Sequence, residues 1–307
     1  MRCLITGGAG FIGSNLTDRL IDEGHEVIIF DDLSTGSQYN INEKAKFFKI
    51  DVSNRDAFET ETMKNVMTGV DVVFHMACLA RVQPSIENPM LYHDKNVNGL
   101  VNMLDACRKY DIKRFVFSSS SSVYGDVREE DLPTSESAEL NPMSPYALHK
   151  LVGEQYCDLY NKLYGIETVS LRYFNVYGER QNTEGAYCLV MGVFAGQLLE
   201  GKPMTINGDG NQRRDFTYVG DVIDANMKVG FIDNLCWRGD IFNIGAGDNR
   251  SVNDVATLLG GKRIHRDPVV EPKVTLADNT KAREVLGWKP TQDFEEWVTK
   301  WKEDLGL

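Results

Sequence analysis

Tyr146 and Lys150, in the stretch "SPYALHK", are four positions apart, so on a helix they share one face. A free tyrosine has a pKa of about 10 and is a poor base near neutral pH. A nearby ammonium group stabilises the phenolate, and a fall of about three pKa units requires about 4 kcal/mol. Lys150 and a second cation could supply this in a desolvated cleft. The pair therefore predicts proton transfer by a tyrosine, although Y-x-x-x-K also occurs by chance on solvated helix faces.

A run of five serines, Ser118–Ser122, precedes this predicted helix. Serine runs are typical of flexible linkers, but an apolar run directly before this one is typical of a core strand. We expect residues 113–119 to be a strand of a parallel α/β sheet, whose carboxyl ends face the ligand crevice. Ser120 and Ser122 would then present hydroxyl groups beside Tyr146, where they could hold a substrate alcohol and relay its proton.

A glycine-rich stretch, "ITGGAGFIGSN", follows the first predicted strand and opens a helix. The glycines at positions 7, 8, 10 and 13 permit a tight turn and a close approach of the backbone to a ligand. The N–H groups and the positive dipole of the helix N-terminus attract a pyrophosphate. Because a strand precedes the motif and a helix follows it, the stretch predicts a dinucleotide-binding turn.

Two aspartates lie at the ends of the second and third predicted strands. Asp31 can bind the ribose hydroxyls of an adenosine and would repel the additional phosphate of NADP. Asp51 could reach the adenine. Alternatively, Asp31 only opens a turn and Asp51 only forms an Asx turn. Together with the glycine motif, the two acids predict that the cofactor is NAD.

Strand patterns alternate with longer helical patterns over the first part of the chain. The expected strands are 2–6, 26–31, 46–50, 70–75, 113–119, 167–172 and 240–244, and the main helices are 12–23, 54–65, 89–109 and 146–164. This alternation predicts the α/β class, with a Rossmann-like, doubly wound parallel sheet. We expect an NAD-binding domain over residues 1–172, with 216–246 returning to its sheet. The irregular, glycine-rich residues 173–215 and 247–307 predict a smaller substrate-binding lobe at the C-terminal side.

The composition argues against several classes of partner. The 307 residues carry a formal net charge of −12, which repels nucleic acid over most of the surface. No apolar run approaches the roughly 20 residues that span a bilayer, and the N-terminus enters a strand pattern at once, so we expect a cytoplasmic protein. The five histidines show no metal-ligand spacing, and no metal site is expected.

Across nearly its whole length the chain resembles the extended short-chain dehydrogenases/reductases of the NAD-dependent sugar epimerase/dehydratase family. The likeness is closest to UDP-glucose and UDP-N-acetylglucosamine 4-epimerases. The stretches that carry it include "TGGAGFIGSN", "DDLSTG", "HMACLA", "NVNGL", "SSSSSVYGD", "SPYALHK", "LRYFNVYG", "GDGNQRRDFTYVGDV" and "ADNTKAREVLGW". The resemblance implies a UDP-sugar substrate, bound NAD and a transient 4-keto sugar.

The resemblance also implies roles for individual residues. For the cofactor these are Gly7, Gly10 and Gly13 at the phosphates with Phe11 and Ile12 beside them, Asp31 at the ribose, Asp51 at the adenine, and Ala77 and Asn96 lining the cleft. For the reaction they are Ser120 and Tyr146 in proton transfer, and Lys150 binding ribose and tuning Tyr146. Asn175 and Arg214 are implied contacts of the nucleotide diphosphate, although Arg214 could belong only to a surface pair.

Two departures from the family pattern bear on the reaction. Sugar-nucleotide 4,6-dehydratases carry Thr-Asp-Glu before V-Y-G, and related decarboxylases carry a glutamate there, whereas this chain has Ser120–Ser122. The acid and base that elimination of water needs are therefore missing. Near the C-terminus the family usually carries R-x-G-[DE] before "AD". Pro268 occupies the arginine position, and Arg266 or Lys273 could compensate.

These observations predict a UDP-hexose 4-epimerase, and Thr275 bears on the choice of sugar. In the resembling epimerases the residue at this position walls the pocket near the sugar 2-substituent, and a small residue admits N-acetylated sugars. Thr275 therefore predicts that UDP-glucose/galactose and UDP-N-acetylglucosamine/galactosamine are both interconverted, unless it is a strand residue remote from the sugar. The alternatives are a UDP-glucuronate 4-epimerase and, in another class, a non-catalytic NAD-binding regulatory protein.

A homodimer is also expected. Two predicted helices carry more apolar faces than one contact with a sheet requires. These faces are formed by Val97, Leu100, Val101 and Leu104 on 89–109, and by Val152, Tyr156, Leu159 and Leu163 on 146–164. We expect them to pack against a second subunit, as in the four-helix interface of the family. The alternative is that they fill the core of the monomer.

Overall fold

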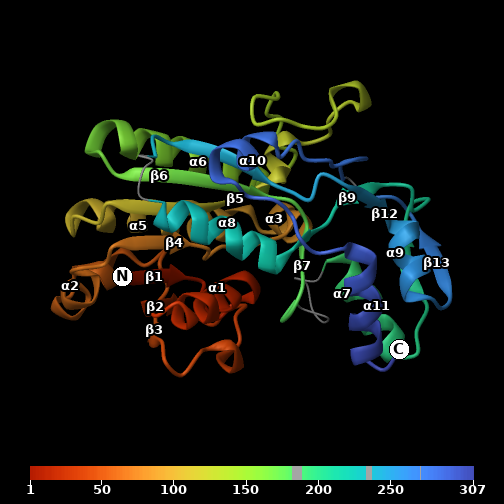
Figure 1. Cartoon of the computed structure of the whole chain (residues 1–307), viewed down its shortest axis with the longest axis horizontal. Coiled ribbons are helices and arrows are strands. Elements are labelled where there is room, and N and C mark those ends of the chain that lie inside the picture. Colours follow the sequence, from red (N-terminus) through yellow and green to blue (C-terminus); the bar gives the residue numbers. More distant parts are fainter. Residues whose placement is uncertain (182–188, 233–236, 270) are drawn as a thin grey trace. The chain divides into compact units, whose positions relative to one another are not determined.

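The computed structural model of the chain describes residues 1–181, 189–232, 237–269 and 271–307 (Figure 1). The chain divides into two compact units. Unit 1 consists of Met1–Val123, Pro142–Arg172 and Ile223–Phe242, and unit 2 of Tyr124–Asn141, Tyr173–Val222 and Asn243–Leu307. The division expected from the sequence, into an NAD-binding domain and a substrate-binding lobe, stays a prediction.

Unit 1 is built on a seven-stranded parallel sheet with the order β11-β6-β5-β4-β1-β2-β3. The strands are β1 (Arg2–Thr6), β2 (Glu26–Asp31), β3 (Lys46–Lys49), β4 (Val72–His75), β5 (Arg114–Ser120), β6 (Glu167–Tyr173) and β11 (Asp240–Ile244). Figure 1 shows the strands from β6 to β3 side by side in this order. The order reverses at β1, which pairs with β2 on one side and β4 on the other. The predicted Rossmann-like α/β class is confirmed.

Alternate side chains of these strands point to opposite faces of the sheet. On one face Phe30 and Phe117 join a core cluster with Leu104 of α5 (Gly99–Lys109) and Cys157 of α6 (Pro145–Tyr164). On the other face Phe74 lies against α8 (Val219–Phe231), and α1 (Phe11–Asp22) follows β1. Helices therefore cover both faces, which explains why the strands read as apolar runs.

The helix α6 begins and ends where its sequence predicts. Ser144 accepts a hydrogen bond from the N–H of Ala147 at 3.2 Å, and Pro145 occupies the first helical position. Gly165 ends the helix with a φ of 72°. Inside it, a Cβ on Gly153 would come within 2.4 Å of the Phe117 ring, so this glycine lets α6 pack closely on β5. The cap places Tyr146 in the first turn of the helix.

The helix predicted over 89–109 is interrupted in the structure. It consists of α4 (Pro89–His93), a π-helical turn (Asp94–Asn98) and α5. Similarly, the helix predicted over 54–65 is a 3-10 turn (Arg55–Glu59) followed by α2 (Glu61–Met67), and a short α3 (Val82–Glu87) precedes α4. Single π turns inside α-helices occur often at functional sites.

Unit 2 contains short strands and helices packed on a separate core. Its pairs among the described residues are β7 (Val176–Tyr177) with β10 (Thr217–Tyr218), β9 (Arg213–Asp215) with β12 (Asn249–Ser251), and β8 (Met204–Asn207) with β13 (Arg263–Arg266). The helices are α7 (Val190–Leu199), α9 (Val252–Leu259), α10 (Thr280–Leu286) and α11 (Phe294–Asp304). Phe194, Val255 and Trp297 from three of these helices meet in its core.

The apolar side chains expected to contact a second subunit differ in their exposure to solvent. Val97, Leu100 and Leu104 are buried in the core of unit 1, so the prediction was wrong for these three side chains. They complete the cover of the sheet. On α6, Leu159 and Leu163 are 44% and 61% exposed. The homodimer itself stays a prediction. In the described part of the chain, no helix is long and apolar enough to cross a membrane.

Candidate active site

In the glycine-rich turn between β1 and α1, neighbouring atoms leave no space for a Cβ atom at Gly7 or Gly13. Gly7 has a φ of 73°, and a Cβ there would lie 2.8 Å from the backbone nitrogen of Ala77. A Cβ on Gly13 would lie 2.2 Å from the carbonyl oxygen of Gly7. Gly10 caps α1 without any side-chain hydrogen bond, and Phe11 and Ile12 form the first turn of the helix. The N-terminus of α1, which carries the positive end of the helix dipole, fits a pyrophosphate group.

Asp31, at the end of β2, is nearly buried. Its carboxylate accepts hydrogen bonds from the backbone N–H groups of Ala9 (2.9 Å) and Leu33 (2.8 Å). Burial raises the pKa of Asp31, while these two hydrogen bonds act in the opposite direction. The carboxylate thus ties β2 to the glycine-rich turn. Because two carboxylate oxygens offer about four acceptor sites, Asp31 retains capacity for ribose hydroxyls.

Asp51 follows β3 and has two kinds of partner. One oxygen accepts hydrogen bonds from the backbone N–H (3.0 Å) and the hydroxyl (2.7 Å) of Ser53, which is the Asx turn considered as the alternative. The other oxygen forms an ion pair with Lys95, which also donates to Asp32 at 3.2 Å. Burial acts to raise the pKa of Asp51, but the bonds from Lys95 and Ser53 outweigh it and the pKa is lowered. Lys95 had no role in the sequence prediction.

The other two residues expected at the cofactor hold the backbone near the glycine-rich turn. The Asn96 side chain accepts a hydrogen bond from the Leu79 N–H at 2.7 Å and donates one to the Leu79 carbonyl at 3.0 Å. The Ala77 N–H donates to the hydroxyl of Thr6 at 3.2 Å. The segment that follows β4 is therefore fixed on both sides. Direct contact of Ala77 and Asn96 with NAD stays a prediction.

Tyr146, Lys150 and Ser120 come together where β5 meets α6. The Tyr146 side chain hydrogen-bonds Ser120, and the Lys150 ammonium lies 5.8 Å from the centroid of the Tyr146 ring. Lys150 is buried and donates to the Ser118 carbonyl at 2.6 Å. Ser120 accepts a hydrogen bond from the Ser122 N–H at 3.2 Å. The serine run is thus the end of a strand and a turn.

The Ser122 hydroxyl has a different environment. Its oxygen is buried and has no hydrogen-bond partner among the residues that the structure describes. A buried hydroxyl without a partner is costly, and such groups in native proteins call for an explanation. The role that the sequence predicts for Ser122, contact with a substrate hydroxyl, stays a prediction.

The pKa of Tyr146 is set by opposing effects. Burial raises it most, the charge of Lys150 lowers it, the Cys78 thiol raises it and the hydrogen bond with Ser120 lowers it. The result is a pKa above the usual value. The expected fall therefore does not follow from Lys150 alone. A lowered pKa of Tyr146 requires a second cation in addition to Lys150, as the sequence analysis expects.

In unit 2, Asn175 and Thr275 lie together. The Asn175 amide donates to the Asp215 carbonyl at 3.1 Å and to the Thr275 hydroxyl at 3.4 Å. The same hydroxyl accepts a hydrogen bond from the Asp215 N–H at 3.1 Å. Asn175 has a φ of 23°, which is uncommon for a residue other than glycine. Thr275 is thus held against β9.

Arg214 on β9 is paired with a carboxylate. Its guanidinium lies 2.5 Å from Glu271, and it also donates to the carbonyls of Arg213 (2.8 Å) and Lys273 (3.4 Å). Glu271 accepts a further hydrogen bond from Gln212 at 3.2 Å. Glu271 belongs to the segment where the chain departs from the family pattern. The predicted diphosphate ligand therefore has an anionic partner within its own unit.

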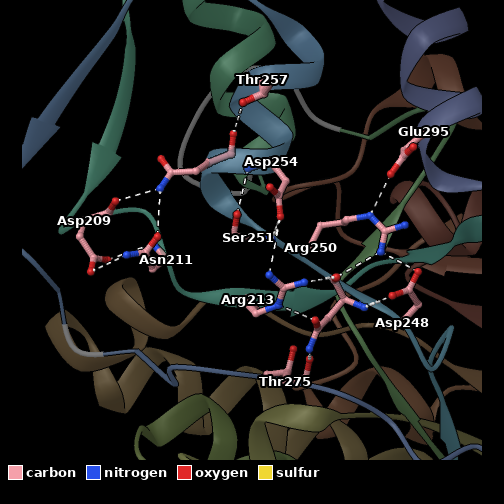
Figure 2. Close-up of polar contacts among 12 residues, drawn as sticks. Asp209, Asn211, Arg213, Asp248, Arg250, Ser251, Asp254, Thr257, Thr275 and Glu295 are labelled. Carbon is pink, nitrogen blue, oxygen red and sulfur yellow. Dashed lines mark hydrogen bonds and ion pairs between the residues drawn. The ribbon is translucent and has the colours of Figure 1, made fainter.

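The neighbouring Arg213 contacts a different set of residues (Figure 2). It donates to the side chain of Asn249 at 2.6 Å and to its carbonyl at 2.8 Å, and lies 3.8 Å from Asp254. These bonds join β9 to β12 and α9. Arg266 and Lys273, which could compensate for the arginine that Pro268 replaces, are both exposed. Among the described residues, no group of three potential metal ligands is arranged to hold an ion.

Comparisons with known proteins agree with this architecture. The model of the NAD dependent epimerase/dehydratase family matches residues 3–245. The UDP-glucose 4-epimerase of Mycolicibacterium smegmatis is 36% identical over 319 residues, covering 98% of this chain and 97% of the relative. The UDP-glucose 4-epimerase of Thermotoga maritima, solved with UDP-glucose, has a TM-score of 0.91 at 34% identity and covers 99% of this chain and 98% of its own.

A third similar protein is the UDP-N-acetylglucosamine 4-epimerase of Methanobrevibacter ruminantium, solved with UDP-N-acetylmuramic acid. It has a TM-score of 0.88 at 32% identity, covering 98% of this chain and 97% of its own. The glycine-rich turn and the nearly buried Asp31 fit the pyrophosphate and ribose of the cofactor that the family name gives. The chain therefore belongs to the NAD-dependent epimerase/dehydratase family, and its cofactor is NAD.

Proposed function

We propose that the protein is a UDP-hexose 4-epimerase that interconverts UDP-glucose and UDP-galactose, and also UDP-N-acetylglucosamine and UDP-N-acetylgalactosamine. The observation that carries the proposal is the contact of Tyr146 with Ser120 and Lys150 at the end of β5. The serines that take the place of the dehydratase acid and base support an epimerase over a dehydratase. The names of the similar proteins support a UDP-sugar substrate.

The chain's own residues account for the proton transfer. Tyr146, as phenolate, removes the proton from the 4-hydroxyl of the sugar, and Ser120 holds that hydroxyl in line with it. Lys150 stabilises the phenolate charge. Bound NAD supplies a hydride acceptor that later returns the hydride, so a full cycle involves no net oxidation. The Ser122 hydroxyl donates to or accepts from a sugar hydroxyl, which satisfies a buried polar atom.

Asn175 and Arg214 are the residues we assign to the diphosphate. A guanidinium can bind two phosphate oxygens at once, and an amide adds a further donor. A 4-keto sugar must turn over to receive the hydride on its other face. Contacts to the diphosphate keep the nucleotide bound while the sugar moves. Arg214 must exchange Glu271 for the diphosphate before it can do so.

Two other functions receive less support. A UDP-glucuronate 4-epimerase needs a further cation for the sugar carboxylate. Arg214 is assigned to the diphosphate, and Arg213 contacts the side chain and the carbonyl of Asn249. A non-catalytic regulatory protein of this fold would be expected to lack Tyr146 or Lys150. Both residues are present and lie in contact distance of the Ser118–Ser120 segment.

The test is a panel of nucleotide sugars. The purified protein, supplied with NAD, is incubated separately with UDP-glucose, UDP-N-acetylglucosamine and UDP-glucuronate, and the 4-epimers are resolved. We expect turnover of the first two. Turnover of UDP-glucuronate alone would favour the alternative enzyme, and turnover of none in protein that binds NAD would favour the regulatory protein.

A further inference from the structure

One face of α6 makes a series of contacts with consecutive residues of β5. Three side chains at intervals of four residues take part. The pairs are Tyr146 with Ser120, Lys150 with the Ser118 carbonyl, and Glu154 with Ser119, whose hydroxyl lies 2.5 Å from the carboxylate. The proposed reaction uses the first two pairs. Glu154 has no role in it so far.

Glu154 belongs to a buried ion pair. Arg172, near the end of β6, contacts it through two nitrogens, with an Nε to Oε1 distance of 2.8 Å and an Nη2 to Oε2 distance of 2.7 Å. The side chains of Arg172 and Glu154 are only 1% and 3% exposed. A buried ion pair is weak evidence for stability, because its desolvation offsets most of the attraction. An apolar pair of similar volume could fill the same space, so packing does not explain the choice of residues.

The direction of the Ser119 side chain links this pair to the reaction. Alternate residues of a strand face the same side, so Ser119 points to the α6 face together with Phe117, which packs in that core. Its neighbours make the two catalytic contacts. The Ser118 carbonyl accepts a hydrogen bond from Lys150, and the Ser120 side chain forms a hydrogen bond with Tyr146. A displacement of Ser119 would therefore move both contacts.

We infer that Glu154 and Arg172 are positioning residues for proton transfer. Arg172 fixes the Glu154 carboxylate, the carboxylate fixes the Ser119 hydroxyl, and the segment Ser118–Ser120 is thereby held against Tyr146 and Lys150. This inference rests on the proposed function. According to this inference, the residue of α6 that holds the Ser118–Ser120 segment in place is Glu154, one helical turn after Lys150.

The variants must separate positioning from stability. Removing one member of the ion pair would leave a buried charge and could prevent folding. We therefore choose Ser119→Ala, which leaves the ion pair intact, and the double variant Glu154→Leu with Arg172→Met, which removes both charges. Ser119→Thr retains a hydroxyl and should therefore retain the kcat of the wild type. Ser170→Ala is the matched control, because Ser170 is a buried serine of β6 whose side chain forms a hydrogen bond with the Cys157 thiol.

The measurements are kcat and KM for UDP-glucose, the unfolding temperature and the content of bound NAD. We expect Ser119→Ala and the double variant to lower kcat by about tenfold or more, since small misplacements of reacting groups can cost about a hundredfold. KM, NAD content and unfolding temperature should change little. Ser119→Thr and Ser170→Ala should keep kcat within about twofold. Unchanged kcat in stable Ser119→Ala and double variants would overturn the inference.

A second readout does not depend on turnover. The groups facing Tyr146 are Lys150 on its own helix, Cys78 after β4 and Ser120 at the end of β5. Because Lys150 and Ser120 both lower the Tyr146 pKa, loss of positioning should raise it. The titration is the absorbance difference between each protein and its Tyr146→Phe counterpart. If the wild type turned over no sugar, the proposed function would fail, and an unshifted titration in Ser119→Ala would still refute the positioning role.

Discussion

Lys150 of unit 1 and Arg214 of unit 2 have different kinds of partner. Lys150 contacts the Ser118 carbonyl and lies near the phenol of Tyr146. Arg214 instead contacts the Glu271 carboxylate at 2.5 Å. A cation beside a phenol and a carbonyl stabilises a negative charge when it forms, which is what proton transfer requires. A cation already paired with a carboxylate must exchange that partner before it binds another anion.

This contrast supports the proposal that proton transfer takes place in unit 1 and that unit 2 binds the diphosphate of the sugar nucleotide. Tyr146→Phe gives the largest expected effect. Phenylalanine keeps the ring but removes the group that exchanges the proton. We expect kcat to fall by a factor of about a thousand or more, at the upper end of general acid–base effects. The unfolding temperature and the bound NAD should be unchanged. Turnover within about tenfold of the wild type would remove Tyr146 from the role of base.

Local patterns are enough to predict that Tyr146, Lys150 and Ser120 come together. The spacing of Tyr146 and Lys150 determines that they share a helix face, and an apolar run predicts that a strand ends at Ser120. The helix 89–109 could not be predicted in detail, because apolar spacing does not reveal a single π turn at Asp94–Asn98. That turn carries Asn96 and Lys95.

The ion pairs could not be predicted because their members are far apart in the sequence. Lys95 is 44 residues from Asp51, and Arg214 is 57 residues from Glu271. No periodic pattern connects such residues, and only the folded chain brings them together. The same holds for Glu154 of α6. Its spacing from Lys150 is visible in the sequence, but its partner Arg172 lies on the strand β6.

Substitution of Arg214 and Glu271 would test the unit 2 side of the contrast. Arg214→Met should raise KM for UDP-glucose by about ten- to a hundredfold, the equivalent of a lost hydrogen bond between charged groups. Its kcat should change much less. Glu271→Gln should lower KM, because a neutral amide competes less with the diphosphate. Steady-state kinetics at fixed salt concentration measure both.

The matched control for these variants is Arg250→Met. Arg250 is also paired with two carboxylates, Asp248 at 2.6 Å and Glu295 at 3.1 Å (Figure 2), but has no predicted role in binding. Its KM should equal that of the wild type. A higher KM in Glu271→Gln would contradict competition, and would mean that the carboxylate itself contributes to substrate binding.

Thr275→Tyr should have a smaller and selective effect. Overpacking a formed pocket costs about 1–3 kcal/mol, so the variant should lose about one to two decades of kcat/KM for UDP-N-acetylglucosamine and little for UDP-glucose. Tyrosine also removes the hydroxyl that accepts from the Asp215 N–H. Thr275→Val, which removes only the hydroxyl, is therefore measured alongside. Equal losses for both sugars would refute the assignment of Thr275 to sugar choice.

The smallest effect on turnover is expected from the outer face of α6. Leu148, Leu159 and Leu163 recur at helical spacing on this face and are 48%, 44% and 61% exposed. Ile86 and Met90, on the adjacent α3 and α4, are exposed as well. Clustered apolar side chains of this kind mark contact surfaces. Unit 2 offers no such cluster among its described residues, where exposed large apolar side chains such as Leu199 lie on separate elements.

We therefore predict a homodimer through this face of unit 1. Leu148→Glu with Leu159→Glu should give a monomer by light scattering at micromolar concentration, because charge at a buried contact is strongly unfavourable. The matched control is Leu199→Glu on α7, which should remain a dimer. Since both leucines point away from the contacts with β5, kcat should stay within about twofold. A wild type that is monomeric would contradict the homodimer. A double variant that stays dimeric would show that this face of α6 does not form the interface.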